Sequence, residues 1–371
     1  MKVLLYVQHL LGIGHLARTS RIASALLDEG FKVTMVSGGE PVSGFPGAGI
    51  DLAQLPPIRS RDQAFSALVN GAGQEIDDRY KADRRDRLLA VLDRIRPNVL
   101  IVEAFPFGRR QMRFELLPLI EAAHALSQPP LIVSSIRDIL QENKKPGRAE
   151  ETADVVRQYF DLVLVHGDSK FARLEETFPL ANTISDKVRY TGLVAPPRPD
   201  PAKDRYDIVV SAGGGAAGGL LVSAALDIAR KRRDLRWCII TGPNAVPVDD
   251  TDGISLFRFR ADFPGLLLNT RVSVSQAGYN TVCDILNAGC GAVLIPFAQG
   301  GETEQSLRAA KLKALGLADV ISETELTPAN LERAVSAIAQ VRTNHTLDLG
   351  GARRTAEILK EKLALRSGRS T

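Results

Sequence analysis

The sequence predicts an α/β protein of two domains, each built on a parallel sheet. Short apolar runs, typical of buried parallel strands, alternate with amphipathic helical segments along the chain. A length of 371 residues favours two domains. Four prolines fall within residues 195–203, where they exclude helix and central strand, so we expect a linker over 195–204.

The composition excludes several functional classes. A net charge of +4, with basic residues scattered among acids, does not indicate a nucleic-acid partner. The three cysteines show no paired ligand spacing, so we expect neither disulfides nor a metal site, and a reducing compartment fits. No apolar run approaches the ~20 residues of a membrane span. We therefore expect a cytoplasmic protein.

The first domain is predicted over residues 1–194. Residues 2–8 form a strand rather than a signal peptide, because Gln8 and His9 interrupt the apolar run and no cleavage pattern follows. A helix begins at His15, and Gly30 ends it. Further strands are predicted at 31–36, 50–55, 97–103, 131–135, 162–165 and 188–192, and helices at 76–96 and 149–159.

The loop between the first strand and helix reads Gly12-Ile-Gly14-His15-Leu-Ala-Arg18. Its two glycines let the backbone approach a ligand, and the helix start offers free N–H groups. A histidine there can act as a base or hold a substrate group, although a tight turn is the alternative. Glu103 ends a strand, where it either shares acid–base work with His15 or forms an ion pair with Arg109 or Arg110.

The second domain is predicted over residues 205–350 and repeats this alternation. Its first strand, 207–211, leads into a glycine loop in which Gly213, Gly215 and Gly218 fit G-x-G-x-x-G. A nicotinamide site also needs an acid at the end of the next strand, which here ends in Thr241 and Gly242. The pattern therefore does not favour a dehydrogenase.

Residues 272–310 carry the densest set of signals in the chain. A strand enters the turn Ser275-Gln276-Ala277-Gly278, and a helix bearing Asp284 follows. A second strand at 292–296 feeds a polar loop and a helix that opens with Glu304 and Gln305. Glycine turns and helix starts at strand carboxyl ends favour a phosphate, and a carboxylate such as Asp284 can hold a ribose diol.

These motifs resemble the donor-binding half of the GT-B glycosyltransferases, specifically the MurG-like family with a glycosyltransferase family 28 C-terminal domain. The resemblance lies in Gly278, Asp284, Gly289-Cys290-Gly291, Pro296-Phe297 and Glu304-Gln305. The loop with His15 resembles the first loop of GT-B transferases, and is still more similar to the UDP-sugar hydrolase of pseudaminic acid synthesis, in which this histidine is catalytic.

The resemblance implies a GT-B fold, with two Rossmann-like domains facing a central cleft and a C-terminal helix, 351–371, that packs back on the first domain. It implies a metal-independent transferase that uses a UDP-sugar as its substrate and no cofactor, with His15 and Glu103 as catalytic residues. The implied donor-binding residues are Gly12, Gly14, Arg18, Ser211, Gly213, Gly214, Gly215, Phe259, Arg260, Gln276, Gly278, Asp284, Glu304 and Gln305.

Three positions depart from the family pattern. Asp284 stands in place of a glutamate, Glu304 in place of a glutamine and Arg308 in place of an asparagine. The donor sugar, expected to be an N-acetylhexosamine, therefore stays open, as does the acceptor, which is a glycan, a lipid-linked molecule or a small molecule. The alternatives are a UDP-sugar hydrolase and a non-catalytic nucleotide-sugar binder. Peripheral membrane contact is compatible with the resemblance.

Overall fold

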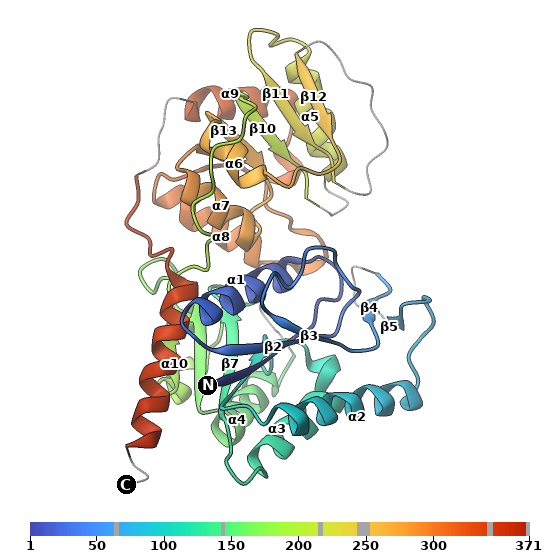
Figure 1. Cartoon of the computed structure of the whole chain (residues 1–371). Coiled ribbons are helices and arrows are strands. Elements are labelled where there is room, and N and C mark those ends of the chain that lie inside the picture. Colours follow the sequence, from blue (N-terminus) through green and yellow to red (C-terminus); the bar gives the residue numbers. More distant parts are fainter. Residues whose placement is uncertain (63–66, 142–144, 214–217, 243–252, 340–343, 369–371) are drawn as a thin grey trace. The chain divides into compact units, whose positions relative to one another are not determined.

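Two parallel sheets organise the chain, and each belongs to its own unit (Figure 1). The computed structural model describes residues 1–62, 67–141, 145–213, 218–242, 253–339 and 344–368. Unit 1 comprises Met1–Val194 and Leu347–Thr371, and unit 2 comprises Ala195–Thr346. The predicted α/β class with two parallel-sheet domains is confirmed.

Unit 1 holds a seven-stranded sheet in the order β3-β2-β1-β6-β7-β8-β9. Its strands are β1 (Lys2–Val7), β2 (Lys32–Ser37), β3 (Asp51–Gln54), β6 (Val99–Glu103), β7 (Leu131–Arg137), β8 (Leu162–His166) and β9 (Val188–Tyr190). Its helices are α1 (Gly14–Asp28), α2 (Asp78–Ile95), α3 (Arg113–His124), α4 (Arg148–Tyr159) and α10 (Gly351–Ser367). A small antiparallel pair, β4 (Ile58–Ser60) and β5 (Leu68–Asn70), lies outside this sheet.

Alternate residues of the central strands point to opposite faces of this sheet. Leu4 and Tyr6 of β1 share one apolar core with Leu88 of α2, Leu116 of α3 and Val156 of α4. Figure 1 shows α1 on the other side of the sheet from α2 and α3, with α10 in red beside the same unit.

Unit 2 holds a six-stranded parallel sheet in the order β12-β11-β10-β13-β14-β15. Its strands are β10 (Ile208–Ser211), β11 (Trp237–Ile240), β12 (Ile254–Phe257), β13 (Val272–Ser275), β14 (Gly291–Leu294) and β15 (Asp319–Val320). Its helices are α5 (Gly218–Ala229), α6 (Phe263–Leu268), α7 (Tyr279–Ala288), α8 (Glu304–Ala314) and α9 (Pro328–Ile338). Apolar residues of α5 and α9 form one core with the strands.

Each sheet has a point at which its strand order reverses. In unit 1, β1 lies between β2 and β6, and in unit 2, β10 lies between β11 and β13. The loops that leave the two central strands diverge there, so a crevice opens at the carboxyl edge of each sheet, the usual place for ligands in open α/β folds.

The chain segments that join the units pack on one unit or the other. Residues 195–204, expected as a linker, contact α6, since Ala202 N donates to Gly265 O at 3.1 Å and Asn269 Nδ2 donates to Ala202 O at 2.7 Å. The segment before α10 packs on unit 1, where Leu193 N donates to Asp348 O at 2.7 Å. Among the described helices, none has the length and apolar character to cross a membrane.

Candidate active site

The crevice of unit 1 brings together His15, Arg18 and Glu103. Glu103 is the last residue of β6 and is 1% exposed, and the two basic residues come from the first two turns of α1. His15 Nδ1 lies 2.6 Å from Glu103 Oε1, and the guanidinium of Arg18 donates to the same oxygen. Of the two alternatives from the sequence, Glu103 thus lies beside His15 rather than forming an ion pair with Arg109 or Arg110.

The electrostatics of this cluster favour a neutral imidazole beside an ionised carboxylate. Burial and the positive charge of Arg109 lower the pKa of His15 to about 3, against the opposing charge of Glu103. Burial alone would raise the pKa of Glu103, but His15 and Arg18 outweigh it, and the pKa falls to about 2. A neutral His15 donates from Nδ1 to Glu103, so its Nε2 carries the lone pair that can accept a proton.

Glu103 also retains unused binding capacity. Its Oε2 is buried and has no hydrogen-bond partner within the described ranges. A buried acceptor left in this state costs about 1–3 kcal/mol in a purely structural role. Such a cost is typical of functional sites, where it persists because the surrounding structure fixes the group.

Two further basic residues complete this edge of the sheet. Arg109 donates from Nε to Gln8 O at 2.8 Å, in the loop that leads to His15. His166 ends β8 and is buried between Ser135, whose Oγ lies 2.7 Å from Nε2, and Thr191. His166 was not predicted as a site residue, although its position at the carboxyl end of a predicted strand could have indicated one.

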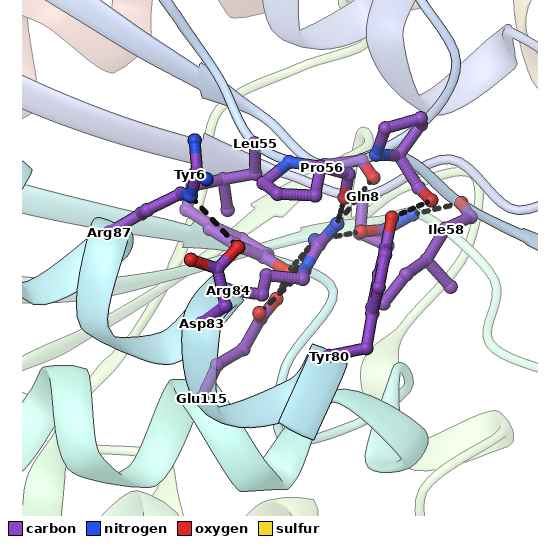
Figure 2. Close-up of polar contacts among 12 residues, drawn as sticks. Tyr6, Gln8, Leu55, Pro56, Ile58, Tyr80, Asp83, Arg84, Arg87 and Glu115 are labelled. Atoms are coloured by element: carbon purple, nitrogen blue, oxygen red, sulfur yellow. Dashed lines mark hydrogen bonds and ion pairs between the residues drawn. The ribbon is translucent and has the colours of Figure 1, made fainter. Parts of the chain in front are cut away.

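A buried ion-pair network is centred on Arg84 of α2 (Figure 2). We call Tyr6, Gln8, Arg84 and Glu115 the Arg84 network; all four are fully buried. Arg84 Nε donates to Glu115 Oε2 at 2.6 Å, and its other nitrogens donate to Gln8 and to the carbonyls of Gly38 and Pro56. Arg84 thus ties α2 to the chain that follows β1, β2 and β3, which fixes the start of the His15 loop.

In unit 2, the turns after β10 and β13 meet at the reversal point. Gly213 has a φ of +66°, and a Cβ there would lie 2.9 Å from Gln276 Oε1. The buried Nε2 of Gln276 has no hydrogen-bond partner in the described part of the chain. Gly278 begins α7 without a side-chain cap, and open space lies where its Cβ would be. The N-terminal end of a helix and the amide donor of Gln276 suit an anion such as a diphosphate.

The start of α8 differs from what the sequence suggested. Glu302 Oε1 accepts hydrogen bonds from Glu304 N at 2.6 Å and Gln305 N at 3.2 Å, so a carboxylate already occupies this helix start. Gln305 Oε1 accepts from Phe297 N at 3.2 Å. Glu304 is buried and forms an ion pair of 2.7 Å with Arg308. These contacts fix Glu304 and Gln305 within unit 2, and their predicted contact with the donor sugar stays a prediction.

Arg308 holds the neighbouring turn in place. It is fully buried, and its Nη1 donates to Ala277 O at 3.1 Å, one residue before Gly278. The two departures at 304 and 308 are therefore partners, since a carboxylate and a guanidinium replace two neutral side chains of the family pattern.

The remaining predicted donor residues fall into three groups. The first group is accessible. Ser211 is half-buried at the end of β10, where it pairs with Ser275. Gly12 and Gly14, just before and at the start of α1, are exposed, and Phe259 is 74% exposed. The second group has little free side-chain surface. Arg18 and Asp284 are buried. Arg260 donates hydrogen bonds of 2.8–2.9 Å to Asp204 and Asp262. Gly214 and Gly215 lie outside the described residues.

Comparison with known proteins identifies a family and relatives to which this chain is similar. Residues 205–353 match the glycosyltransferase family 28 C-terminal domain. The chain is 22% identical over 330 residues to a UDP-N-acetylglucosamine--N-acetylmuramyl-(pentapeptide) pyrophosphoryl-undecaprenol N-acetylglucosamine transferase of Sulfurihydrogenibium sp. (strain YO3AOP1), covering 87% of this chain and 86% of the relative. The transferase of the same description from Rhizobium leguminosarum bv. trifolii (strain WSM2304) is 24% identical over 341 residues, covering 88% and 84%.

Solved structures agree at the level of the fold. The glycotransferase of kitacinnamycin superposes with a TM-score of 0.68 at 13% identity, covering 98% of this chain and 99% of that chain. MurG of Acinetobacter baumannii gives a TM-score of 0.59 at 14% identity, covering 97% and 100%.

The fold, the family match and the relatives together define a glycosyltransferase of the GT-B class. Within that class the chain is similar to the MurG-like transferases, and the resemblance predicted from residues 278–305 is confirmed. The relatives named here are transferases, and they lend no support to the hydrolase alternative.

Proposed function

We propose that this chain transfers a sugar from a UDP-sugar to an acceptor hydroxyl without a metal ion. The observation that carries the proposal is the match of unit 2 to the family 28 C-terminal domain. The open start of α7 at Gly278 and the unused amide of Gln276 support it, because both suit a nucleotide diphosphate.

The residues of unit 1 supply the base. His15 Nε2 accepts the proton of the acceptor hydroxyl, while Glu103, to which Arg18 also donates, holds the ring through Nδ1. The acceptor oxygen forms a bond to the anomeric carbon of the sugar as the bond from that carbon to the diphosphate breaks. The electron pair of the broken bond leaves with UDP. Amides at the start of α7 stabilise the charge on UDP, so no cation is needed for this step.

The donor proposed is a UDP-N-acetylhexosamine, because the curated relatives are named as UDP-N-acetylglucosamine transferases. Their names give a pyrophosphoryl-undecaprenol acceptor, so a lipid-linked acceptor hydroxyl is part of the proposal. The Glu304–Arg308 pair stands where the family pattern has neutral side chains, and for this reason the donor screen below includes a second sugar.

Calorimetric titration with UDP, UDP-N-acetylglucosamine, UDP-glucose and NAD tests the donor site. We expect UDP and one UDP-sugar to bind, and Gly278→Val to weaken that binding at least tenfold, because its side chain would enter the open space at the start of α7. Ala337→Val, at an exposed position in the last turn of α9, is the control. Binding of NAD alone, or UDP binding that Gly278→Val leaves unchanged, would contradict the proposal. Release of UDP in an acceptor screen then tests transfer.

A further inference from the structure

A cavity of about 300 Å³ in unit 1 has no part in the chemistry described above. Its walls come from the loop after β6, residues 140–141 after β7, the first turns of α4 and the chain after β8. The lining includes Phe107, Arg110, Leu140, Arg148 and Phe178. This volume is at the lower end of the range for small-molecule sites, about 300–1,000 Å³.

One wall of the cavity is apolar. Phe107 and Phe178 pack edge to face with ring centroids 5.1 Å apart, and Leu140 adjoins them in the lining. Phe178 is 6% exposed, which fixes its ring in place. This wall can bury a ring or an alkyl group of a ligand.

Two arginines supply positive charge to the lining of the cavity. Arg110 shares the carboxylate of Glu151 with Arg113, so one acid serves two guanidiniums. Arg148 forms no ion pair with any residue that the structure describes. Glu176 also lines the cavity, and its Oε1 accepts a hydrogen bond from Arg173 N at 2.8 Å, so the lining carries two guanidiniums and one carboxylate. Burial lowers the pKa of Arg110, and the positive charges of Arg113 and Arg148 lower it further, which reflects their mutual repulsion. An anion between Arg110 and Arg148 would relieve that repulsion.

The loop 104–110 connects this cavity to the His15–Glu103 pair. Glu103 precedes the loop, Arg109 donates to Gln8 O in the His15 loop, and Phe107 and Arg110 line the cavity. Gly108 N donates to Ala104 O at 2.7 Å, which closes the loop on itself. Ala104 and Arg109 have φ values of +64° and +56°, a region that few non-glycine residues adopt.

We infer that this cavity binds an apolar group of the acceptor that carries a phosphate or a carboxylate. The apolar part packs on Phe107 and Phe178, and the anionic oxygens bind Arg110 and Arg148, whose planar guanidiniums match both anions. The inference rests on the proposed function for calling the ligand an acceptor. The ligand class itself follows from the lining of the cavity.

Titration of the full chain with phenyl phosphate and hexyl phosphate tests the inference, with phenol, hexanol and inorganic phosphate as comparison probes. We expect at least one ester to bind ten times more tightly than inorganic phosphate and than its own alcohol. Tighter binding of the phenyl ester identifies an aromatic ligand, and tighter binding of the hexyl ester identifies a lipid-like one. Equal binding of inorganic phosphate, or no saturable binding of either ester, overturns the inference.

A pair of variants on α4 locates the binding. We expect Arg148→Gln to weaken binding of the better ester at least tenfold, and Arg157→Gln, in the last turn of the same helix and outside the lining, to leave it unchanged. Unchanged ester binding in Arg148→Gln overturns the site. Because UDP is titrated separately, a wild-type chain that binds the ester but not UDP contradicts the proposed function and leaves the cavity assignment standing.

Discussion

At the residue scale, the contact between His15 Nδ1 and Glu103 gives the two ring nitrogens different tasks. Nδ1 is hydrogen-bonded to Glu103, and Nε2 can accept a proton. We therefore expect His15→Ala to lower kcat by about 10²–10⁴-fold, the usual contribution of a general base. UDP affinity should not change, because the variant lies in the other unit. A kcat within twofold of wild type, measured by UDP release with a working acceptor, would exclude His15 as the base.

His166 makes the stability of unit 1 depend on pH. Burial and the charge of Arg18 lower its pKa to about 3, whereas the unfolded chain has a histidine pKa of about 6.5. Between these values the unfolded chain binds a proton that the folded chain does not. Stability therefore falls as pH falls, by about 2 kcal/mol from pH 6.5 to pH 5.

Urea unfolding of His166→Gln across this pH range checks the effect. We expect the variant to lose the share of the slope that His166 contributes, about 2 kcal/mol between pH 6.5 and pH 5, and to keep the similar share that His15 contributes. His124→Gln, which changes an exposed histidine of α3, should retain the whole slope. The same slope in His166→Gln as in wild type would refute the assignment.

Some residues of the candidate site could be predicted from the sequence, whereas the contacts of others could not. Gly12, His15 and Glu103 could be found because each lies at the end of a predicted strand or the start of a helix. The partners of Arg260 and Gln305 could not be found, because Asp204 lies 56 residues from Arg260 and because Gln305 bonds a backbone amide of the preceding loop. Such contacts depend on tertiary packing rather than on local pattern.

At the scale of elements, α2 shows how a helix with a largely charged surface stabilises a fold. Arg84 and Glu115 are both fully buried, so removal of Arg84 leaves an uncompensated carboxylate in the core. We expect Arg84→Met to lower the free energy of unfolding by about 3–5 kcal/mol. Arg87→Met on the same helix removes an exposed arginine paired with Asp83 (Figure 2) and should cost less than about 0.5 kcal/mol.

Urea midpoints with unchanged m-values measure this difference. The double variant Arg84→Met with Glu115→Gln should lose less than the sum of the two single variants, because the second change removes the stranded charge. Additive losses would show that the pair does not act as a unit.

Most helices and strands were predicted within a few residues, because their apolar periodicity is strong. Helix α3 and the strands β4 and β5 are among those that were not. In α3, Pro118 lies inside the helix and adjacent leucines obscure the helical period. The antiparallel pair β4–β5 has three residues in each strand, too few for an alternating pattern to be recognised.

At the scale of the whole molecule, unit 1 depends on α10. Gly351 begins this helix so close to Gly192 O that a Cβ would collide with backbone. We expect Gly351→Ala to destabilise unit 1 by about 1–3 kcal/mol, the usual cost of overpacking. UDP binding, assigned to unit 2, should be unchanged. Thermal unfolding followed with and without UDP checks both statements, and a variant as stable as wild type would contradict the first.

The crossing of the chain from unit 1 to unit 2 and back has a consequence for how the protein is made. Unit 2 is an insertion within unit 1, and α10 is synthesised after the whole of unit 2. During vectorial synthesis the seven-stranded sheet leaves the ribosome before unit 2, whereas α10, which contacts α1, leaves it after unit 2. The face of α1 that α10 covers therefore stays exposed to solvent until the inserted unit has been translated.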